Sequence, residues 1–339
     1  DMTMAVGPRA LLGKVALREC SLCEEEVELE VLYEADGTRL VRRFGERRLD
    51  ACMWSASAQL EAALSLTSGA FVITGGLGGL GLLAARALVE LGARTLVLLS
   101  RSGRVSYEGQ GLEEQLRWLK DESGAAVHVW RCDVSDESSV QGMLERVRGL
   151  GEGIGGIVHS AGILRDATLR SEAAASGCAD VWSSKARSAW LLHKHSQHDN
   201  LKLFLMFSSI TSCLGNIGQA SYGASNSFLD GLVESRRMLG LPGQAVQWPA
   251  VAGVGMAHAT SSSANAILAN TISTSEVSAV LRGLFLEAVG EGASVSGRGA
   301  VTTILPEEVQ VTLQAVGSRG GSRMVLRQLC EVSLASASA

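Results

Sequence analysis

Four side chains in the second half of the chain could together move a proton. Tyr222 and Asn226 are four residues apart in an amphipathic run, so their side chains share one face of the expected helix. Ser209 follows the apolar run 203–208, and Lys185 lies in a separate helical pattern upstream. A tyrosine hydroxyl can donate a proton to a developing oxyanion, but its ordinary pKa of about 10 is high for exchange at neutral pH. Because a nearby ammonium favours the phenolate, we expect Lys185 to lower the pKa of Tyr222.

A glycine-rich segment indicates a second kind of chemistry, the binding of phosphate groups. Residues 74–81 read Thr-Gly-Gly-Leu-Gly-Gly-Leu-Gly, directly after the apolar run 70–73 and before a helical pattern. Glycine permits the tight turn and lets the backbone approach a pyrophosphate, which the following helix N-terminus attracts. The segment therefore predicts a dinucleotide-binding turn, whose binding residues are Thr74, Gly75, Gly76, Gly78, Gly79, Leu80 and Gly81.

The next apolar run ends at Ser100 and Arg101, which favours one of the two nicotinamide cofactors. NAD-binding turns carry a carboxylate near this position for the ribose 2′-hydroxyl, and this chain has none there. Arg101 could instead pair with a 2′-phosphate, although it could also merely coat the strand end. We therefore predict NADPH as the cofactor. The ends of the two following runs are expected to contact the adenine (Asp133, Val134) and to pass beneath the ribose and nicotinamide (Ser160, Ala161, Gly162).

The elements that position these residues alternate along the chain. Apolar runs separated by amphipathic segments predict parallel strands with helical crossovers, and ligands of such sheets bind at the carboxyl ends of the strands. We therefore predict an α/β fold with a doubly wound parallel sheet, the Rossmann fold. Ser135 is the expected N-cap of the helix after the third run. The runs are 71–74, 95–100, 127–132, 156–159, 203–208 and 245–248.

Three segments of the chain differ in pattern. Residues 27–44 alternate in polarity around Asp36-Gly37, which predicts a β-hairpin within a first segment, 1–66, that ends in an Ala/Ser-rich connector. Residues 67–300 hold the alternating pattern and form the expected catalytic domain. Past 300 the periodicity fades, so residues 301–339 are expected to be a linker or tail.

Composition excludes several classes of protein. Hydrophobic residues make up 46% of the chain and charged residues 19%, which is typical of a globular protein. A net charge of −5 and the absence of a basic run give no reason to expect nucleic acid, and no apolar run is long enough for a membrane span. Seven scattered cysteines favour a reducing, cytoplasmic location. The lone pair Cys20 and Cys23, and the trio His193, His195 and His198, lack further ligands nearby in sequence, so no metal site is expected.

The combination resembles the ketoreductase domains of modular polyketide synthases and related fatty acid synthases, within the short-chain dehydrogenase/reductase superfamily. Most of that superfamily pairs its tyrosine with a lysine four residues later, where this chain has Asn226. In the ketoreductase variant the lysine lies upstream, as Lys185 does here. The flanking residues match too, from Gly215 to Ala220 and from Asn226 to Asp230, and the resemblance covers about residues 67–300.

The resemblance implies a function and a role for each residue. The domain would use NADPH to reduce a β-ketoacyl thioester on an acyl carrier protein, acting as a 3-ketoacyl-[acyl-carrier-protein] reductase among neighbouring synthase domains. Tyr222 would protonate the oxyanion, Ser209 would hydrogen-bond it, Lys185 would lower the tyrosine pKa and Asn226 would hold the relay. The 27–44 hairpin would be the tail of a truncated structural subdomain.

Two family markers bear on stereochemistry, and two alternative functions stay open. Asp166 keeps the last residue of a Leu-Asp-Asp motif although Arg165 replaces its middle one, and Leu214 stands where the opposite class has tryptophan. Together these favour a D (3R) hydroxyl. The segment 257–275 occupies the place of the family's substrate lid. The alternatives are a freestanding reductase of small ketones and an inactive NADPH-binding scaffold.

Overall fold

The predicted hairpin is present in the N-terminal part of the chain. The computed structural model describes residues 31–33, 39–41, 64–106, 109–168, 171–255, 271–289 and 300–304. The chain divides into two compact units, 1–48 with 307–339, and 49–306. In the first, β1 (Val31–Tyr33) pairs antiparallel with β2 (Arg39–Val41), with Val31 opposite Val41. The rest of the 27–44 segment lies outside the described residues.

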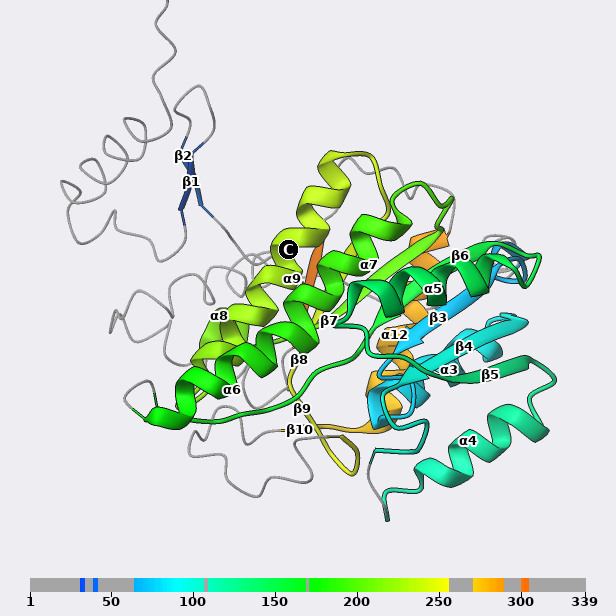
Figure 1. Ribbon diagram of the computed structural model, residues 1–339, viewed down its shortest axis with the longest axis horizontal. Helices are drawn as coiled ribbons and strands as arrows, with labels where there is room; N and C mark the ends of the chain where they lie inside the picture. The colour runs from blue at the N-terminus through cyan, green and yellow to red at the C-terminus, as the bar shows by residue number, and fades with distance from the viewer. Residues whose placement is uncertain are drawn as a thin grey trace, which may run out of the picture. The chain divides into compact units, whose positions relative to one another are not determined.

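The second unit is built on a seven-stranded sheet in which all neighbouring strands are parallel (Figure 1). The order β11-β8-β7-β6-β3-β4-β5 reverses direction at β3, as in a doubly wound fold. All six predicted strands are confirmed, each to within two residues at its ends. They are β3 (Ala70–Thr74), β4 (Thr95–Ser100), β5 (Ala126–Arg131), β6 (Ile154–His159), β7 (Leu203–Ser209) and β8 (Gln244–Trp248).

The sheet has one strand more than the sequence predicted. β11 (Val301–Thr303) pairs with β8, and the Thr303 hydroxyl donates a hydrogen bond to Oε1 of Gln247 at 2.6 Å. The boundary expected at residue 300 therefore falls one residue before a strand of the sheet. Three residues are too few for the alternation of a strand to show in the sequence.

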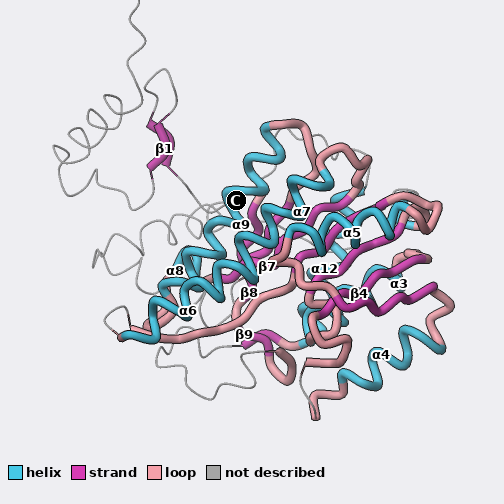
Figure 2. Tube along the Cα trace, in the orientation of Figure 1, coloured by secondary structure: helices cyan, strands magenta, loops and turns pink. Residues whose placement is uncertain are grey.

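Helices cover both faces of the sheet (Figure 2). Alternate residues of the strands pack into the two hydrophobic cores, one on each face. Phe71 and Ile73 of β3 pack with α3 and α12, whereas Ala70 and Val72 pack with α5, α7 and α9. The helices on the first face are α3 (Gly79–Glu90), α4 (Leu112–Asp121) and α12 (Thr274–Val289). The others are α5 (Glu137–Arg148), α6 (Glu172–Trp182), α7 (Ser188–Ser196), α8 (Thr211–Leu214) and α9 (Ala220–Met238).

Two further elements lie near the site: an irregular helical turn and a pair of short strands. A π-helical turn, η2 (Ser183–Arg187), joins α6 to α7. After β8 and Pro249, β9 (Ala250–Val251) pairs in parallel with β10 (Thr271–Ile272). Most of the expected lid segment, residues 257–270, lies outside the described residues.

The N-cap of α5 is Asp136, so the expectation of Ser135 was wrong by one residue. The Asp136 carboxylate accepts a hydrogen bond from the backbone N–H of Ser139 at 2.8 Å, three residues ahead, as an N-cap side chain does. Ser135 instead donates its hydroxyl proton to Asp133 Oδ1 at 2.7 Å.

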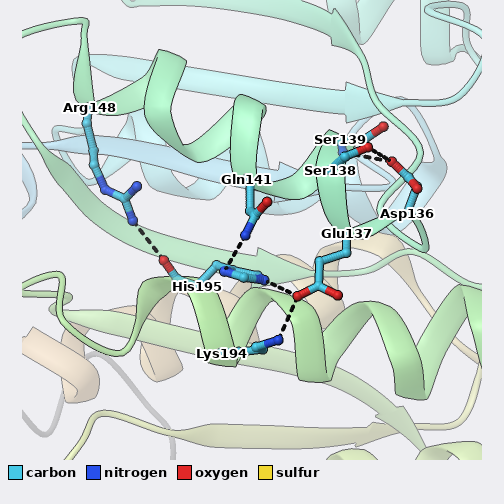
Figure 3. Close-up of polar contacts among 8 residues, drawn as sticks. All are labelled: Asp136, Glu137, Ser138, Ser139, Gln141, Arg148, Lys194 and His195. Carbon is cyan, nitrogen blue, oxygen red and sulfur yellow. Dashed lines mark hydrogen bonds and ion pairs between the residues drawn. The ribbon is translucent and has the colours of Figure 1, made fainter.

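Surface polar contacts join α5 to α7 (Figure 3). Glu137 Oε1 lies 2.7 Å from Lys194 Nζ and 2.9 Å from His195 Nε2, and Arg148 donates to the His195 carbonyl at 2.8 Å. His195 thus serves as a helix–helix contact. None of the described helices combines the length and apolarity that a membrane crossing requires.

Candidate active site

The glycine-rich turn lies between β3 and α3 and has no room for side chains at four of its positions, Gly75, Gly76, Gly79 and Gly81. Gly75 has φ of +63°, and a Cβ there would come within 2.9 Å of the Ala161 backbone. A Cβ on Gly81 would overlap the carbonyl oxygen of Gly75. The backbone therefore passes close to itself at the start of α3, which leaves a bare surface of the kind that a pyrophosphate needs. Thr74, Gly76, Gly78, Gly79 and Leu80 complete this turn.

A cavity of about 530 Å³ opens at the carboxyl ends of β3, β4, β5 and β6. Its volume is within the range of small-molecule and cofactor sites. Half of the predicted cofactor residues line it: Gly75, Ser100, Arg101, Asp133, Val134, Ala161 and Gly162. Ser160 is not among the lining residues, and it donates its hydroxyl proton to the Thr74 carbonyl at 2.7 Å. The turn and the cavity together fit a dinucleotide.

Four further residues of the cavity wall were not among the predicted cofactor residues. Ser183 and Ser184 of the π-turn line it, as do Arg165 and Asp180, which form an ion pair at 3.6 Å. Their segments lie far from the glycines in sequence: Arg165 follows β6, Asp180 lies in α6, and the two serines lie in the π-turn.

The second part of the site lies on α9 and at the end of β7. Tyr222 and Asn226 share one face of α9, and Asn226 Nδ2 donates to the backbone carbonyl of Tyr222 at 2.8 Å. Ser209, the last residue of β7, is buried. Polar interactions of the Asn226 and Ser209 side chains with the phenol both act to lower the pKa of Tyr222. The predicted tyrosine, serine and asparagine therefore meet.

Lys185 reaches the same place from the π-turn. Its side chain is buried, and Nζ lies 5.2 Å from the centre of the Tyr222 ring. Nζ donates a hydrogen bond to the Phe207 carbonyl of β7 at 2.8 Å. Gly162 packs against the lysine stem so closely that a Cβ there would come within 2.8 Å of Lys185 Cε. The cofactor cavity and the lysine are thus in direct contact through Gly162.

Burial controls the protonation of this pair, and here one expectation was wrong. Burial raises the pKa of Tyr222 to about 12, although its hydrogen bonds with Asn226 and Ser209 act in the opposite direction. Burial also lowers the pKa of Lys185 to about 7. The net pKa of Tyr222 is therefore raised, opposite to the expected direction. A low-dielectric site disfavours the charged forms of both residues, and this effect of burial outweighs the polar contacts of the phenol.

Sequence reasoning missed Asp230 as a member of this cluster. It follows Asn226 by four residues on α9 and is buried. Its Oδ2 accepts hydrogen bonds from Ser212 Oγ at 2.9 Å and from Gln247 Nε2 at 2.8 Å. Its charge raises the pKa of Lys185 and so opposes the effect of burial. The spacing 222, 226, 230 on one helix face could have identified it.

Of the two expected stereochemical markers, Asp166 contacts the residue at the start of α9. Both oxygens of Asp166 accept from Gln219 Nε2, at 3.2 and 3.0 Å, and Gln219 is the N-cap of α9. The charge of Asp166 also raises the pKa of Tyr222, so the carboxylate acts near the phenol. Leu214 ends α8.

Metal ligands are not gathered anywhere in the part of the chain that the structure describes: no group of three or more His, Cys, Asp or Glu side chains could hold an ion there. His193 lies 2.9 Å from the guanidinium of Arg236. Cys20 and Cys23 lie outside the described residues.

Comparison with known proteins finds one family model, the KR domain, matching residues 69–253. Polyketide synthase GfsB of Streptomyces halstedii is 40% identical over 190 residues, which is 56% of this chain and 3% of that protein's length. A solved structure of A-type ketoreductases from a modular polyketide synthase is similar in fold, with a TM-score of 0.73 at 23% identity, over 98% of this chain and 64% of that one. The first ketoreductase of the tylosin polyketide synthase gives a TM-score of 0.66 at 26% identity, over 90% and 61%.

The lowered pKa of Lys185 makes the stability of the protein depend on pH in a defined direction. Between pH 7 and about 10.4 the unfolded lysine binds a proton that the folded one has lost, so this residue makes the free energy of unfolding rise with pH. Replacing it by methionine removes that contribution. We expect the free energy of unfolding of the wild type, relative to Lys185→Met, to rise by up to about 4 kcal/mol across this range.

Urea denaturation of both proteins at several pH values measures this difference. Lys194→Met, at a half-exposed lysine of α7, controls for the loss of a positive charge. A constant difference between wild type and Lys185→Met from pH 7 to 10 would show that the lysine is not buried in its uncharged form.

Proposed function

This chain belongs to the KR domain family, and we propose that it catalyses the NADPH-dependent reduction of a β-ketoacyl thioester to the β-hydroxyacyl thioester. Ketone reduction on a nicotinamide-binding fold is what the family implies. One observation carries the finer proposal: Lys185, Ser209 and Tyr222 converge at the carboxyl end of β7, next to the nucleotide cavity. That convergence also speaks against an inactive scaffold.

Each of these residues has a separate task in the proposed reaction. The bound nicotinamide would supply the hydride that reduces the ketone carbon. The Ser209 hydroxyl would hydrogen-bond the substrate oxygen, and the neutral Tyr222 phenol would donate its proton to that oxygen. A pKa of about 12 suits this direction of transfer, because an alkoxide is a far stronger base than a phenolate.

Lys185 would then stabilise the tyrosine after it has lost its proton. Its Nζ is 5.2 Å from the ring centre, so an ammonium there would attract a phenolate strongly in a buried site. The charge of Asp230 would favour the protonated lysine and so offset part of the effect of burial, and the hydrogen bond from Asn226 to the Tyr222 carbonyl would hold the first turn of α9 in place.

We further propose that the substrate is carried on the phosphopantetheine arm of an acyl carrier protein. The support is the similarity to GfsB, a polyketide synthase of which this chain spans 3% of the length. Neighbouring synthase domains belong to the same proposal. A freestanding reductase of small ketones would instead turn over free ketones as well as the carrier-bound thioester.

The activity depends most directly on the Tyr222 hydroxyl. With a β-ketoacyl N-acetylcysteamine thioester, the wild type should oxidise NADPH. Tyr222→Phe should lower kcat by roughly 10²–10⁴-fold, because the phenol proton has no substitute. NADPH absorbance measures the rate. Tyr33→Phe, in the other compact unit, is the matched control and should keep full activity. Full activity in Tyr222→Phe would refute the assignment.

The preference for NADPH should depend on Arg101, which lines the cavity. A guanidinium–phosphate pair contributes about 1.5–3 kcal/mol, so Arg101→Ala should reduce the ratio of kcat/KM for NADPH over NADH by roughly 10–100-fold. Arg86→Ala, which removes an exposed arginine paired with Glu90 on α3, is the control. An unchanged ratio in Arg101→Ala would show that Arg101 does not bind the 2′-phosphate of NADPH.

The product should have the D (3R) configuration. Asp166 hydrogen-bonds Gln219 at the start of α9, on one side of Tyr222. Leu214 stands where ketoreductases of the opposite stereochemical class have a tryptophan. Chiral chromatography of the hydroxyacyl product separates the two enantiomers. An excess of the L product would contradict this assignment.

A further inference from the structure

His159 is a buried histidine for which the mechanism above has no use. It is the last residue of β6 and has no exposed surface. Its ring lies between two segments that are far apart in sequence. Nδ1 is 2.7 Å from the hydroxyl of Thr74 in the glycine-rich turn, and Nε2 is 3.0 Å from the backbone carbonyl of Lys185 in the π-turn.

The hydrogen bonds around the ring determine which nitrogen carries the proton. Burial lowers the pKa of His159 to about 3, so the ring is neutral and has a single N–H. Nε2 is 3.0 Å from the Lys185 carbonyl, which can only accept, and 3.2 Å from the Ser188 hydroxyl, whose shortest contact is as a donor to the Ser184 carbonyl at 2.7 Å. We therefore assign the N–H to Nε2, so that Nδ1 accepts from the Thr74 hydroxyl. The Thr74 oxygen in turn accepts from the backbone N–H of Ala161 at 3.3 Å. One directed series of bonds therefore runs from the cofactor turn to the lysine.

The carbonyl that His159 contacts lies at the centre of the irregular turn. The backbone N–H of Ser188 bonds to the carbonyls of Ser183, five residues back, and Lys185. The Ser188 hydroxyl is also within reach of the Lys185 carbonyl, at 3.0 Å. π-turns are rare in helices and occur mainly at functional sites, because the extra residue changes the direction of the side chains around it. In this turn the affected side chain is that of Lys185.

We propose that His159 is a positioning residue for the catalytic lysine. By tying the Lys185 carbonyl to the glycine-rich turn, it holds the π-turn in the register that delivers the ammonium to the Phe207 carbonyl and to Tyr222. The two halves of the site, cofactor turn and proton donor, are thereby set at a fixed distance from each other. The expected effect on kcat rests on the proposed function, whereas the expected effect on the position of the π-turn and Lys185 does not.

Replacing His159 by either of two amide side chains distinguishes this positioning role from a general need for a polar group at this buried position. The amide nitrogen of glutamine can take the place of Nε2 and donate to the Lys185 carbonyl, whereas the shorter asparagine reaches only the position of Nδ1 near Thr74. We therefore expect His159→Asn to lower kcat by roughly 10–100-fold, equivalent to about 1.4–2.7 kcal/mol of transition-state stabilisation. His159→Gln should keep kcat within about threefold of the wild type.

The dissociation constant of NADPH, measured by fluorescence, should change less than about threefold in both variants, a difference that amounts to under 1 kcal/mol. Crystal structures of the full chain give a readout independent of activity. In His159→Asn, residues 183–187 should rewind and the hydrogen bond from Lys185 Nζ to Phe207 should be lost, whereas His159→Gln should retain both. His193→Asn is the matched control, at a buried histidine whose partner is Arg236.

The inference is overturned if the Asn and Gln variants have equal kcat and both keep the π-turn. Should either variant fail to fold, Thr74→Val, which removes the hydroxyl at the other end of the ring, must show the same displacement of Lys185 in its crystal structure, and an unmoved lysine overturns the inference. If the wild type itself reduces no thioester, the proposed function has failed, and the structures of the π-turn alone decide the role of His159.

Discussion

The rest of the site depends on one constraint: Lys185 is buried, and burial disfavours its positive charge. Desolvation lowers the pKa of Lys185 to about 7, so the ammonium exists only because its surroundings offset part of that cost. The offset comes from three directions: the Phe207 carbonyl of β7, the face of the Tyr222 ring and the charge of Asp230. Each partner belongs to a different part of the fold or to a different turn of α9. A lysine on a regular surface helix would be protonated without help, but it would be shielded by water from the tyrosine.

The doubly wound sheet allows these partners to meet. Parallel strands bring their carboxyl ends to one edge, so Thr74, His159 and Ser209 lie at the ends of β3, β6 and β7. The helix α9 passes this edge with residues 222, 226 and 230 on one face. The strands place the nucleotide turn and the serine, and the helix supplies the phenol. Only the lysine needs an irregular element, the π-turn, to enter the space between them.

The parts of this arrangement that the sequence predicted are those with a repeating or rigid pattern. Apolar runs of four to six residues identified six strands, and the glycines of 74–81 identified the turn, because steric requirements leave few other residues possible there. Motif resemblance selected Lys185, Ser209, Tyr222 and Asn226, which the fold brings together. The direction of the Tyr222 pKa shift was wrong, because a sequence shows charges but not their burial. The π-turn carries no pattern in Ser-Ser-Lys-Ala-Arg, and the helix cap at Asp136 differs from the expected one by a single residue.

The edge strand β11 has a consequence for how this domain can be cut from a larger polypeptide. The Thr303 hydroxyl hydrogen-bonds the carboxamide of Gln247, and that carboxamide donates to Asp230. A fragment that ends after α12, where the helical pattern stops, would lack β11. Strand β8 would then have no neighbour on that side, and Gln247 would lose its hydrogen bond with Thr303. Asp230 would then lose a hydrogen-bond donor, which would change its effect on the pKa of Lys185. An expressed fragment that ends there could therefore fold and still lose activity.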